Sequence, residues 1–152
     1  MALRRGENVA ALSRRTEPLS ELQEEYSAQL LLQNTDVTNE QSVADAVQRT
    51  VDRFGSINVV ANNAGYRLFG AVEEDSDAQA RAIFDTNVFG VLNVLRATLP
   101  VLRAQGSGHI LQGSSLHGQF AHRASGCLRQ PNSLWKASRR PCSRRWLPWA
   151  SR

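Results

Sequence analysis

Apolar residues come in short runs separated by longer amphipathic stretches over most of this chain. The runs lie at residues 8–12, 29–32, 57–61 and 109–111. Runs of this length with few polar residues are typical of strands buried on both faces of a sheet. Between the second and third runs, apolar residues recur at helical spacing from Val43 to Phe54, and Gly55 follows where such a helix would end. The alternation predicts a parallel sheet covered by helices on both faces.

Two further stretches have the pattern of helices. One covers residues 18–25 and begins at a proline, which is favoured in the first helical turn. The other covers residues 76–105, with Ser76 as its N-cap and Gly106 as its stop. Pro100 lies inside the second stretch and predicts a bend or local break there.

Charge divides the chain into two parts. Residues 1–120 carry ten arginines and fourteen acids, a net charge of −4, whereas residues 121–152 carry seven arginines, one lysine and no acid, a net charge of +8. All three tryptophans and both cysteines also lie in the second part. We therefore expect a domain over residues 1–120 and a basic, irregular tail over residues 121–152.

Composition excludes several classes of protein. No apolar stretch approaches the roughly 18 residues needed to span a bilayer, so we expect no membrane segment. No apolar run follows Arg4 and Arg5, and we expect no secretory signal. The only cysteines, Cys127 and Cys142, form no closely spaced metal-ligand cluster, so no metal site is expected. These features favour a cytoplasmic, reduced setting.

Polar motifs follow several of the apolar runs. They are Asp36-Val37-Thr38, Asn62-Asn63-Ala64-Gly65 and Gly113-Ser114-Ser115. In open α/β sheets, ligands bind beyond the carboxyl ends of the strands, where these motifs are expected to lie. The coincidence is the first indication of a binding site.

The N-N-A-G sequence at residues 62–65 resembles a signature of the short-chain dehydrogenase/reductase family. Four further matches follow in the family's order: Asp36-Val37-Thr38, Phe84-Asp85-Thr86-Asn87, His109-Ile110 and Ser114-Ser115. The resemblance covers roughly residues 1–120. It implies a partial Rossmann-type, doubly wound parallel sheet of the α/β class and a nicotinamide-dependent oxidoreductase.

The resemblance assigns cofactor contacts to two of the motifs. It implies that Asp36, followed by Val37, contacts the adenine and that the backbone of residues 62–65 lines the cofactor cleft. A side chain at Gly65 would obstruct the approach of the dinucleotide. The alternative is an ordinary turn after a strand, because Asn and Gly are common turn residues. The expected cofactor-binding residues of these motifs are Asp36, Val37, Asn62, Asn63, Ala64 and Gly65.

Arg14 and Arg15 follow the first apolar run, where the family selects its cofactor. An acid at this place would bind the ribose 2′-hydroxyl of NAD, whereas arginine suits the 2′-phosphate of NADP. No acid occurs before Glu17, so NADP is the expected cofactor. The competing interpretation is a pair of solvated surface arginines.

Ser115 and Asn87 match family residues that take part in catalysis. The resemblance implies that Ser115 hydrogen-bonds the substrate oxygen and that Asn87 supports a proton relay through a bound water. Without the resemblance, Ser115 would be a turn or cap serine and Asn87 a residue that bends or caps a helix. Tyr66 follows Gly65 and is expected near the substrate entrance, and His117 is expected to be a loop residue without a catalytic role.

Two parts of the family pattern are absent from this sequence. No T-G-x-x-x-G-x-G turn, which would bind the pyrophosphate, precedes the first run, and the sheet is expected to lack its first strand. Strand edges exposed in this way favour aggregation. Leu128 and Asn132 occupy the positions where the family has its catalytic Tyr-x-x-x-Lys pair. A tyrosine of that kind is the general acid/base of the reaction.

The tail over residues 132–152 is compatible with a frameshift. Reading its permitted codons two nucleotides later gives an amphipathic helix similar to the one that follows the catalytic tyrosine in the family. Tryptophan has one codon, so Trp135-Lys136 must give Glu and Trp149-Ala150 must give Gly, and both fit. The catalytic tyrosine itself is not recovered in that frame.

Three functions are therefore weighed. The first is an NADP-dependent reductase or dehydrogenase acting on a small-molecule carbonyl or secondary alcohol, impaired by the missing Tyr/Lys pair. The second is a non-catalytic gene remnant or a mis-assembled product. The third, an Arg/Trp tail that binds nucleic acid or an acidic membrane, is disfavoured, so no nucleic-acid or membrane partner is expected. Family relatives often associate through the helix that carries Asn87, so a homo-oligomer is an open expectation.

Overall fold

The structure is a computed structural model that describes residues 2–68 and 72–113. Its four strands are β1 (Val9–Ser13), β2 (Leu30–Asn34), β3 (Val59–Asn62) and β4 (His109–Gln112). Each strand overlaps one of the four apolar runs and differs from it by one or two residues at the ends. The predicted strands are confirmed.

The helices also follow the predicted pattern. They are the 3₁₀ turns η1 (Leu3–Arg5), η2 (Glu17–Leu19) and η3 (Val72–Glu74), the α-helices α1 (Ser20–Glu25), α2 (Glu40–Phe54), α3 (Asp77–Phe84) and α4 (Val91–Gln105), and the π-helix η4 (Asp85–Gly90). Of the bend or break predicted at Pro100, the break is wrong, because α4 continues through this residue. The irregular segment of the long helix is instead η4, which ends at Gly90, nearly three turns before the proline.

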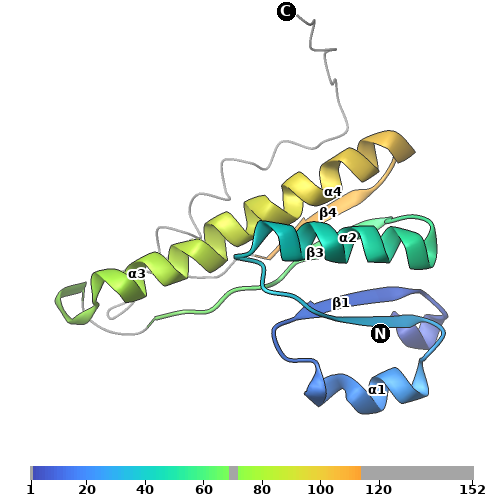
Figure 1. Ribbon diagram of the computed structural model, residues 1–152, viewed down its shortest axis with the longest axis horizontal. Helices are drawn as coiled ribbons and strands as arrows, with labels where there is room; N and C mark the ends of the chain where they lie inside the picture. The colour runs from blue at the N-terminus through green and yellow to red at the C-terminus, as the bar shows by residue number, and fades with distance from the viewer. Residues whose placement is uncertain (1, 69–71, 114–152) are drawn as a thin grey trace, which may run out of the picture.

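The strands form two separate parallel pairs. β1 pairs with β2, and β3 pairs with β4. Within the described residues no strand joins the two pairs. In Figure 1 the pair β3–β4 lies behind α2 and α4, while the pair β1–β2 lies beside α1. The α/β class and the partial, parallel character of the sheet are thus confirmed, but the strands form two small sheets where one was predicted.

The main apolar core lies between the β3–β4 pair and the helices α2 and α4. Val43 and Val47 of α2 and Leu102 of α4 meet Val60 of β3 and the preceding Ile57 in one buried cluster. Alternation along β3 directs Val60 into this cluster and its neighbours Val59 and Ala61 to the opposite face. The core therefore fixes one face of the β3–β4 pair.

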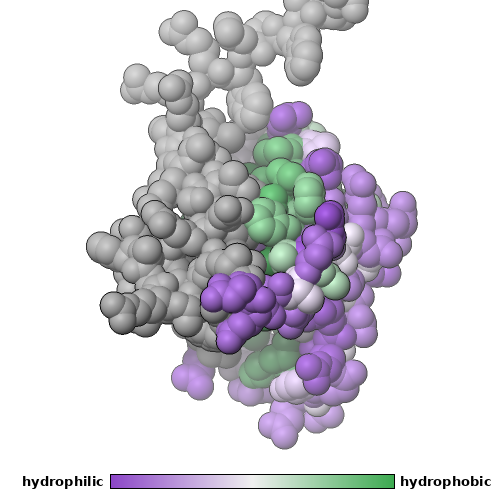
Figure 2. Space-filling view, turned by 90° about the vertical axis from the view of Figure 1, so that its left-hand side faces the viewer, coloured by the Kyte–Doolittle hydropathy of each residue, from purple (hydrophilic) through white to green (hydrophobic). Residues whose placement is uncertain are grey.

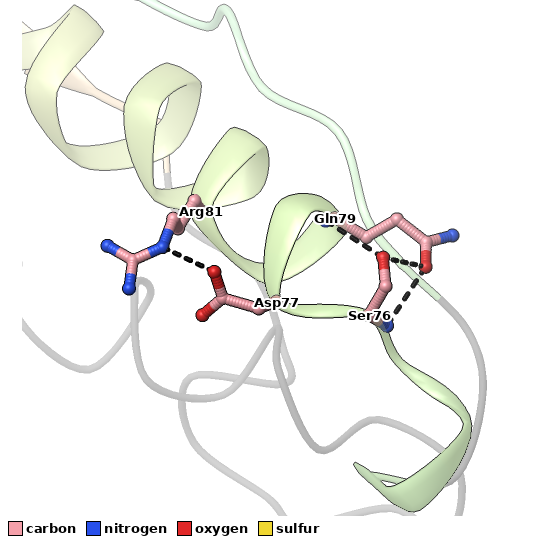
Figure 3. A network of polar contacts seen from close by, with 4 residues as sticks. All are labelled: Ser76, Asp77, Gln79 and Arg81. Carbon is pink, nitrogen blue, oxygen red and sulfur yellow. Dashed lines mark hydrogen bonds and ion pairs between the residues drawn. The ribbon is translucent and has the colours of Figure 1, made fainter.

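Figure 3 shows how the helix that leads to the site begins. The Ser76 hydroxyl accepts from the Gln79 backbone N–H at 3.2 Å, and the Gln79 side-chain oxygen accepts from the Ser76 backbone N–H at 3.0 Å. This reciprocal pair is a capping box, and it satisfies two donors that a helix end leaves free. Asp77 and Arg81, one turn apart, add an exposed ion pair of 2.6 Å. The predicted N-cap at Ser76 is confirmed.

The far end of the same long helix holds the start of β3. The Gln105 side chain accepts from the Ile57 backbone N–H at 3.0 Å and donates to the Ile57 carbonyl at 2.8 Å. An amide side chain that bonds both groups of one peptide fixes that residue against the helix. β3 therefore begins at a position set by α4.

Part of the surface is apolar. Figure 2 shows apolar residues gathered on one face amid polar ones. Val59 of β3 is 54 % exposed and Leu111 of β4 is 59 % exposed, and the pairing of Ala61 with Leu111 puts these side chains on the same face of the pair. Phe89 of η4 is also about half exposed. Parallel sheets are normally covered on both faces, so the face of β3–β4 opposite the core is unusual.

Candidate functional site

A pocket of about 320 Å³ lies where three strands end. Arg14 follows β1, Asp36 and Thr38 follow β2, and Tyr66 follows β3. The remaining wall comes from the helix α3 and the start of η4, through Ala82, Asp85 and Thr86. Carboxyl ends of parallel strands are the usual place for a ligand in an α/β fold. The arrangement puts a cation, two carboxylates and a phenol around one space.

Asp36 organises the turn after β2. Its Oδ1 accepts from the Thr38 backbone N–H at 2.9 Å and from the Thr38 hydroxyl at 2.8 Å. These two bonds, more than the nearby charge of Arg14, hold the pKa of the Asp36 carboxyl below its ordinary value. Both bonds end on Oδ1. Within residues 2–68 and 72–113, no hydrogen bond to Oδ2 is seen. A ligand donor can therefore reach an ionised carboxylate oxygen here.

The two arginines after β1 occupy different positions. Arg14 lines the pocket, whereas Arg15 is exposed and does not line it. The Arg15 backbone N–H donates to the Ser13 hydroxyl at 3.3 Å, which helps to turn the chain after the strand. Only one of the two guanidinium groups predicted to bind a phosphate thus faces this space.

Asn87 is fixed by the backbone of Tyr66. Its side-chain oxygen accepts from the Tyr66 N–H at 3.1 Å, and its side-chain nitrogen donates to the Tyr66 carbonyl at 2.9 Å. Asn87 is 9 % exposed and lies in the π-helix η4, a conformation that is frequent at functional sites. The helix thereby sets where Tyr66 stands at the pocket wall.

Gly65 is a glycine because Asn87 lies against it. A Cβ at Gly65 would stand 2.9 Å from the Asn87 side-chain oxygen. Its φ is outside the left-handed region, so backbone freedom is not the requirement. We expected a bound dinucleotide to exclude a side chain here, but the protein's own asparagine already does so.

The rest of the N-N-A-G motif joins the ends of β3 and β4. The buried Asn62 side chain donates to the Gln112 side-chain oxygen at 3.2 Å, and the Asn62 carbonyl accepts from the Gly113 N–H at 2.8 Å. Asn63 and Ala64 are exposed beyond the strand. The motif therefore holds the carboxyl ends of β3 and β4 together, and its exposed part leads to Tyr66 at the pocket.

Val37 faces the long helix. A Cβ at Gly90 would stand 2.7 Å from a Val37 methyl carbon, so α4 begins in close contact with the turn after β2. Of the residues that line the pocket, Thr38, Ala82, Asp85 and Thr86 were not singled out for binding by sequence reasoning. The signal for the last two was present, because they belong to the matched segment that ends at Asn87.

Several predictions fall outside the described residues. Ser115, His117 and the tail over residues 121–152 all lie there. The assignment of Ser115 as a catalytic residue, the domain boundary and the irregular character of the tail therefore stay predictions.

Two properties can be stated for residues 2–68 and 72–113. Their helices are too short or too polar to cross a bilayer. Their histidines and acids form no group of three that could hold a metal ion.

Comparison with known proteins agrees with this geometry. A family model described as short chain dehydrogenase matches residues 1–127. The oxidoreductase BOA17 of Botryotinia fuckeliana is 38 % identical over 135 residues, covering 88 % of this chain and 48 % of that protein. An uncharacterized oxidoreductase of Schizosaccharomyces pombe is 38 % identical over 99 residues, 65 % of this chain and 42 % of that protein. The chain thus spans about half the length of the curated relatives it matches.

Solved structures show the same fold. A short-chain dehydrogenase from Streptomyces avermitilis is 30 % identical with a TM-score of 0.84, covering 90 % of this chain and 51 % of that one. A serine dehydrogenase complexed with NADP⁺ is 25 % identical with a TM-score of 0.84, covering 90 % and 56 %. The family model spans most of the sequence. The chain belongs to the short-chain dehydrogenase family.

Proposed function

We propose that this chain is an NADP-dependent oxidoreductase of the short-chain dehydrogenase type whose hydride transfer is impaired in the present form. The single observation that supports this most is the pocket that joins Arg14, Asp36 and Tyr66 at the ends of three strands. Its volume, about 320 Å³, is at the lower end for ligand pockets and suits one part of a dinucleotide.

The residues fit the adenosine end of the cofactor. The ionised Asp36 carboxylate can accept from the exocyclic amine of adenine, and Arg14, which follows the neighbouring strand β1, can bind a 2′-phosphate. Solved structures similar to this chain hold either NADP⁺ or NAD⁺, as in the serine dehydrogenase and the xylitol dehydrogenase. The presence of an arginine and the absence of an acid directly after β1 favour NADP.

The reacting end of the site is less complete. When bound, the nicotinamide would supply the hydride for a carbonyl or accept it from a secondary alcohol. Asn87 would hold the pocket wall through Tyr66, and Ser115 would orient the substrate oxygen. Leu128 stands at the position that the resemblance assigns to the tyrosine, so the general acid/base is absent from that position. Its loss alone lowers the rate by about 10²–10⁴-fold.

The alternative function is a non-catalytic gene remnant. Leu128 and Asn132, which stand where the family has its Tyr-x-x-x-Lys pair, favour it. The two functions differ in cofactor binding, because a remnant without a working site would not bind NADPH. A small-molecule substrate, homo-oligomer formation and a cytoplasmic location stay predictions in both cases.

Calorimetric titration tests the cofactor site. We expect the full chain to bind NADPH more tightly than NADH, because Arg14 reaches the 2′-phosphate. Arg14→Leu should reduce this preference by about tenfold or more, which corresponds to about 1.4 kcal/mol. Arg15→Leu is the matched control, since Arg15 lies outside the pocket, and it should change the preference little. Equal affinity for both cofactors, or no binding of either, would contradict the proposal.

A further inference from the structure

Asn93 is a buried amide on the side of α4 that faces the turn after β2. It is 7 % exposed, and its side-chain nitrogen donates to the Val37 carbonyl at 3.0 Å. Arg96 donates to the Asn93 side-chain oxygen at 3.0 Å. A guanidinium has no acceptor, so it fixes the oxygen of the amide toward itself and the nitrogen toward Val37. The direction of the Asn93 amide is therefore determined.

Gly90 completes the contact one turn earlier. It is buried, and a Cβ there would stand 2.7 Å from a Val37 methyl carbon and 3.2 Å from the Val37 Cβ. The helix thus contacts Val37 at two points. The backbone of Gly90 packs against the Val37 side chain, and the Asn93 amide donates to the Val37 carbonyl. This two-point contact leaves the turn little freedom to move along or away from α4.

Val37 lies between the two residues that shape the cofactor end of the pocket. Thr38 bonds Asp36 twice from within the turn, and the Asn39 N–H donates to the Asp36 carbonyl at 3.0 Å. Asn93 adds a contact from outside the turn, on the carbonyl of the peptide that joins Val37 to Thr38.

We infer that Asn93 is a positioning residue for the adenosine end of the cofactor, acting through the Val37 carbonyl. The inference rests on the proposed function for its consequence but not for its geometry. Its substitution should loosen the turn over residues 36–39 and weaken adenosine binding, although Asn93 does not line the pocket.

Gln105 provides a control for a merely structural role. It lies on the same helix and also bonds backbone groups, those of Ile57, but at the opposite end of β3 from the pocket. Asn93→Leu and Gln105→Met both remove an amide that satisfies a backbone carbonyl, so both should lower the stability of the fold. Only the first should change the turn. Asn93→Asp keeps the size and the Arg96 partner but places an acceptor against the Val37 carbonyl, and it should act as Asn93→Leu does.

Two measurements on the full chain separate the possible outcomes. Amide exchange by NMR, without ligand, should accelerate at Thr38 and Asn39 by about tenfold more in Asn93→Leu than in Gln105→Met, as expected for one lost hydrogen bond. Titration with 2′,5′-ADP should show affinity about tenfold lower for Asn93→Leu and within about twofold of the parent for Gln105→Met.

The results distinguish the inference from the proposed function. If the parent chain does not bind 2′,5′-ADP, the proposed function fails, and the exchange measurement alone then decides whether Asn93 holds the turn. Equal acceleration in the Leu and Met variants, or equal loss of 2′,5′-ADP affinity, would overturn the inference. So would an Asn93→Asp variant with the parent's exchange rates.

Discussion

Several polar side chains of this site make hydrogen bonds that fix the backbone around the pocket. Asn87 bonds both polar backbone groups of Tyr66, and one carboxylate oxygen of Asp36 accepts two hydrogen bonds from Thr38. Satisfied polar groups of this kind hold a site in one shape before a ligand arrives. The motif residues therefore act as much through the turns they build as through the atoms they present to the pocket.

The contact between Gly65 and Asn87 leads to a test at this scale. Gly65→Ala would place a methyl group 2.9 Å from the Asn87 side-chain oxygen and should displace the amide from Tyr66. We expect a loss of about 1–3 kcal/mol in the free energy of unfolding, measured with urea. In an Asn87→Ala background the same substitution should cost much less. An undiminished cost there would show that another contact requires the glycine.

The low pKa of Asp36 gives a second residue-scale prediction. The Thr38 bonds hold the folded pKa below the unfolded one, so they stabilise the fold above the ordinary carboxyl pKa, and this contribution is lost as the pH falls through the folded pKa. Thr38→Val removes the hydroxyl bond and keeps the backbone bond. The pKa of Asp36, followed by carbon NMR of its carboxyl group, should rise. An unchanged pKa would refute the role of the hydroxyl, with Thr50→Val as a distant control.

Sequence reasoning found the residues that match a motif and missed those that act through geometry. Asn87 and Gly65 could be singled out from the matched segments, but the contact between them could not, because it joins residues far apart in the chain. Asn93 belongs to none of the motifs that match the family. Its only signal is a polar side chain among the apolar positions of a helix, and such a residue is as often a solvated neighbour of the core as a positioning group.

At the scale of elements, the long helix from Asp77 to Gln105 organises the site. Its π-helical segment η4 carries Asn87, and α4 adds Asn93 and Gln105 against other parts of the backbone. The sequence pattern predicts the length and the N-cap of this helix. It does not predict η4, because the extra residue of a π-turn is selected by tertiary contacts that a helical periodicity does not contain.

Pro100 and Pro18 should respond in opposite directions to substitution by alanine. Pro100 lies inside α4, where its missing N–H leaves a helix bond unmade, whereas Pro18 is in the first turn of η2, where no such bond is lost. We expect Pro100→Ala to raise the free energy of unfolding by about 1 kcal/mol and Pro18→Ala to lower it by a few tenths, by urea denaturation. A loss of stability in Pro100→Ala would mean that the helix needs the proline.

At the scale of the whole molecule, the two strand pairs leave apolar surface uncovered. The face of β3–β4 that carries Val59 and Leu111 is exposed in the described part of the chain, and both pairs have unpaired strand edges. Edges and apolar faces of this kind promote association between chains. The fold class and the incomplete sheet could be predicted from the order of motifs, but the separation into two pairs required the coordinates.

This surface predicts concentration-dependent association. Leu111→Lys places a charge on the exposed face without altering the core side of β4, so it should lower the association seen by sedimentation velocity at equal concentration. Gln48→Lys on the exposed side of α2 adds the same charge elsewhere and is the matched control. If both variants reduce association equally, net charge and not the apolar face is responsible.

The binding of adenosine at the strand ends is the central claim, and chemical-shift mapping of 2′,5′-ADP on the labelled full chain tests it most directly. The account predicts that the largest changes cluster at Arg14, residues 36–38 and Tyr66, and that Gly55 and Gly106, at distant helix ends, stay unchanged. Changes scattered over the surface, or none at saturating ligand, would contradict it.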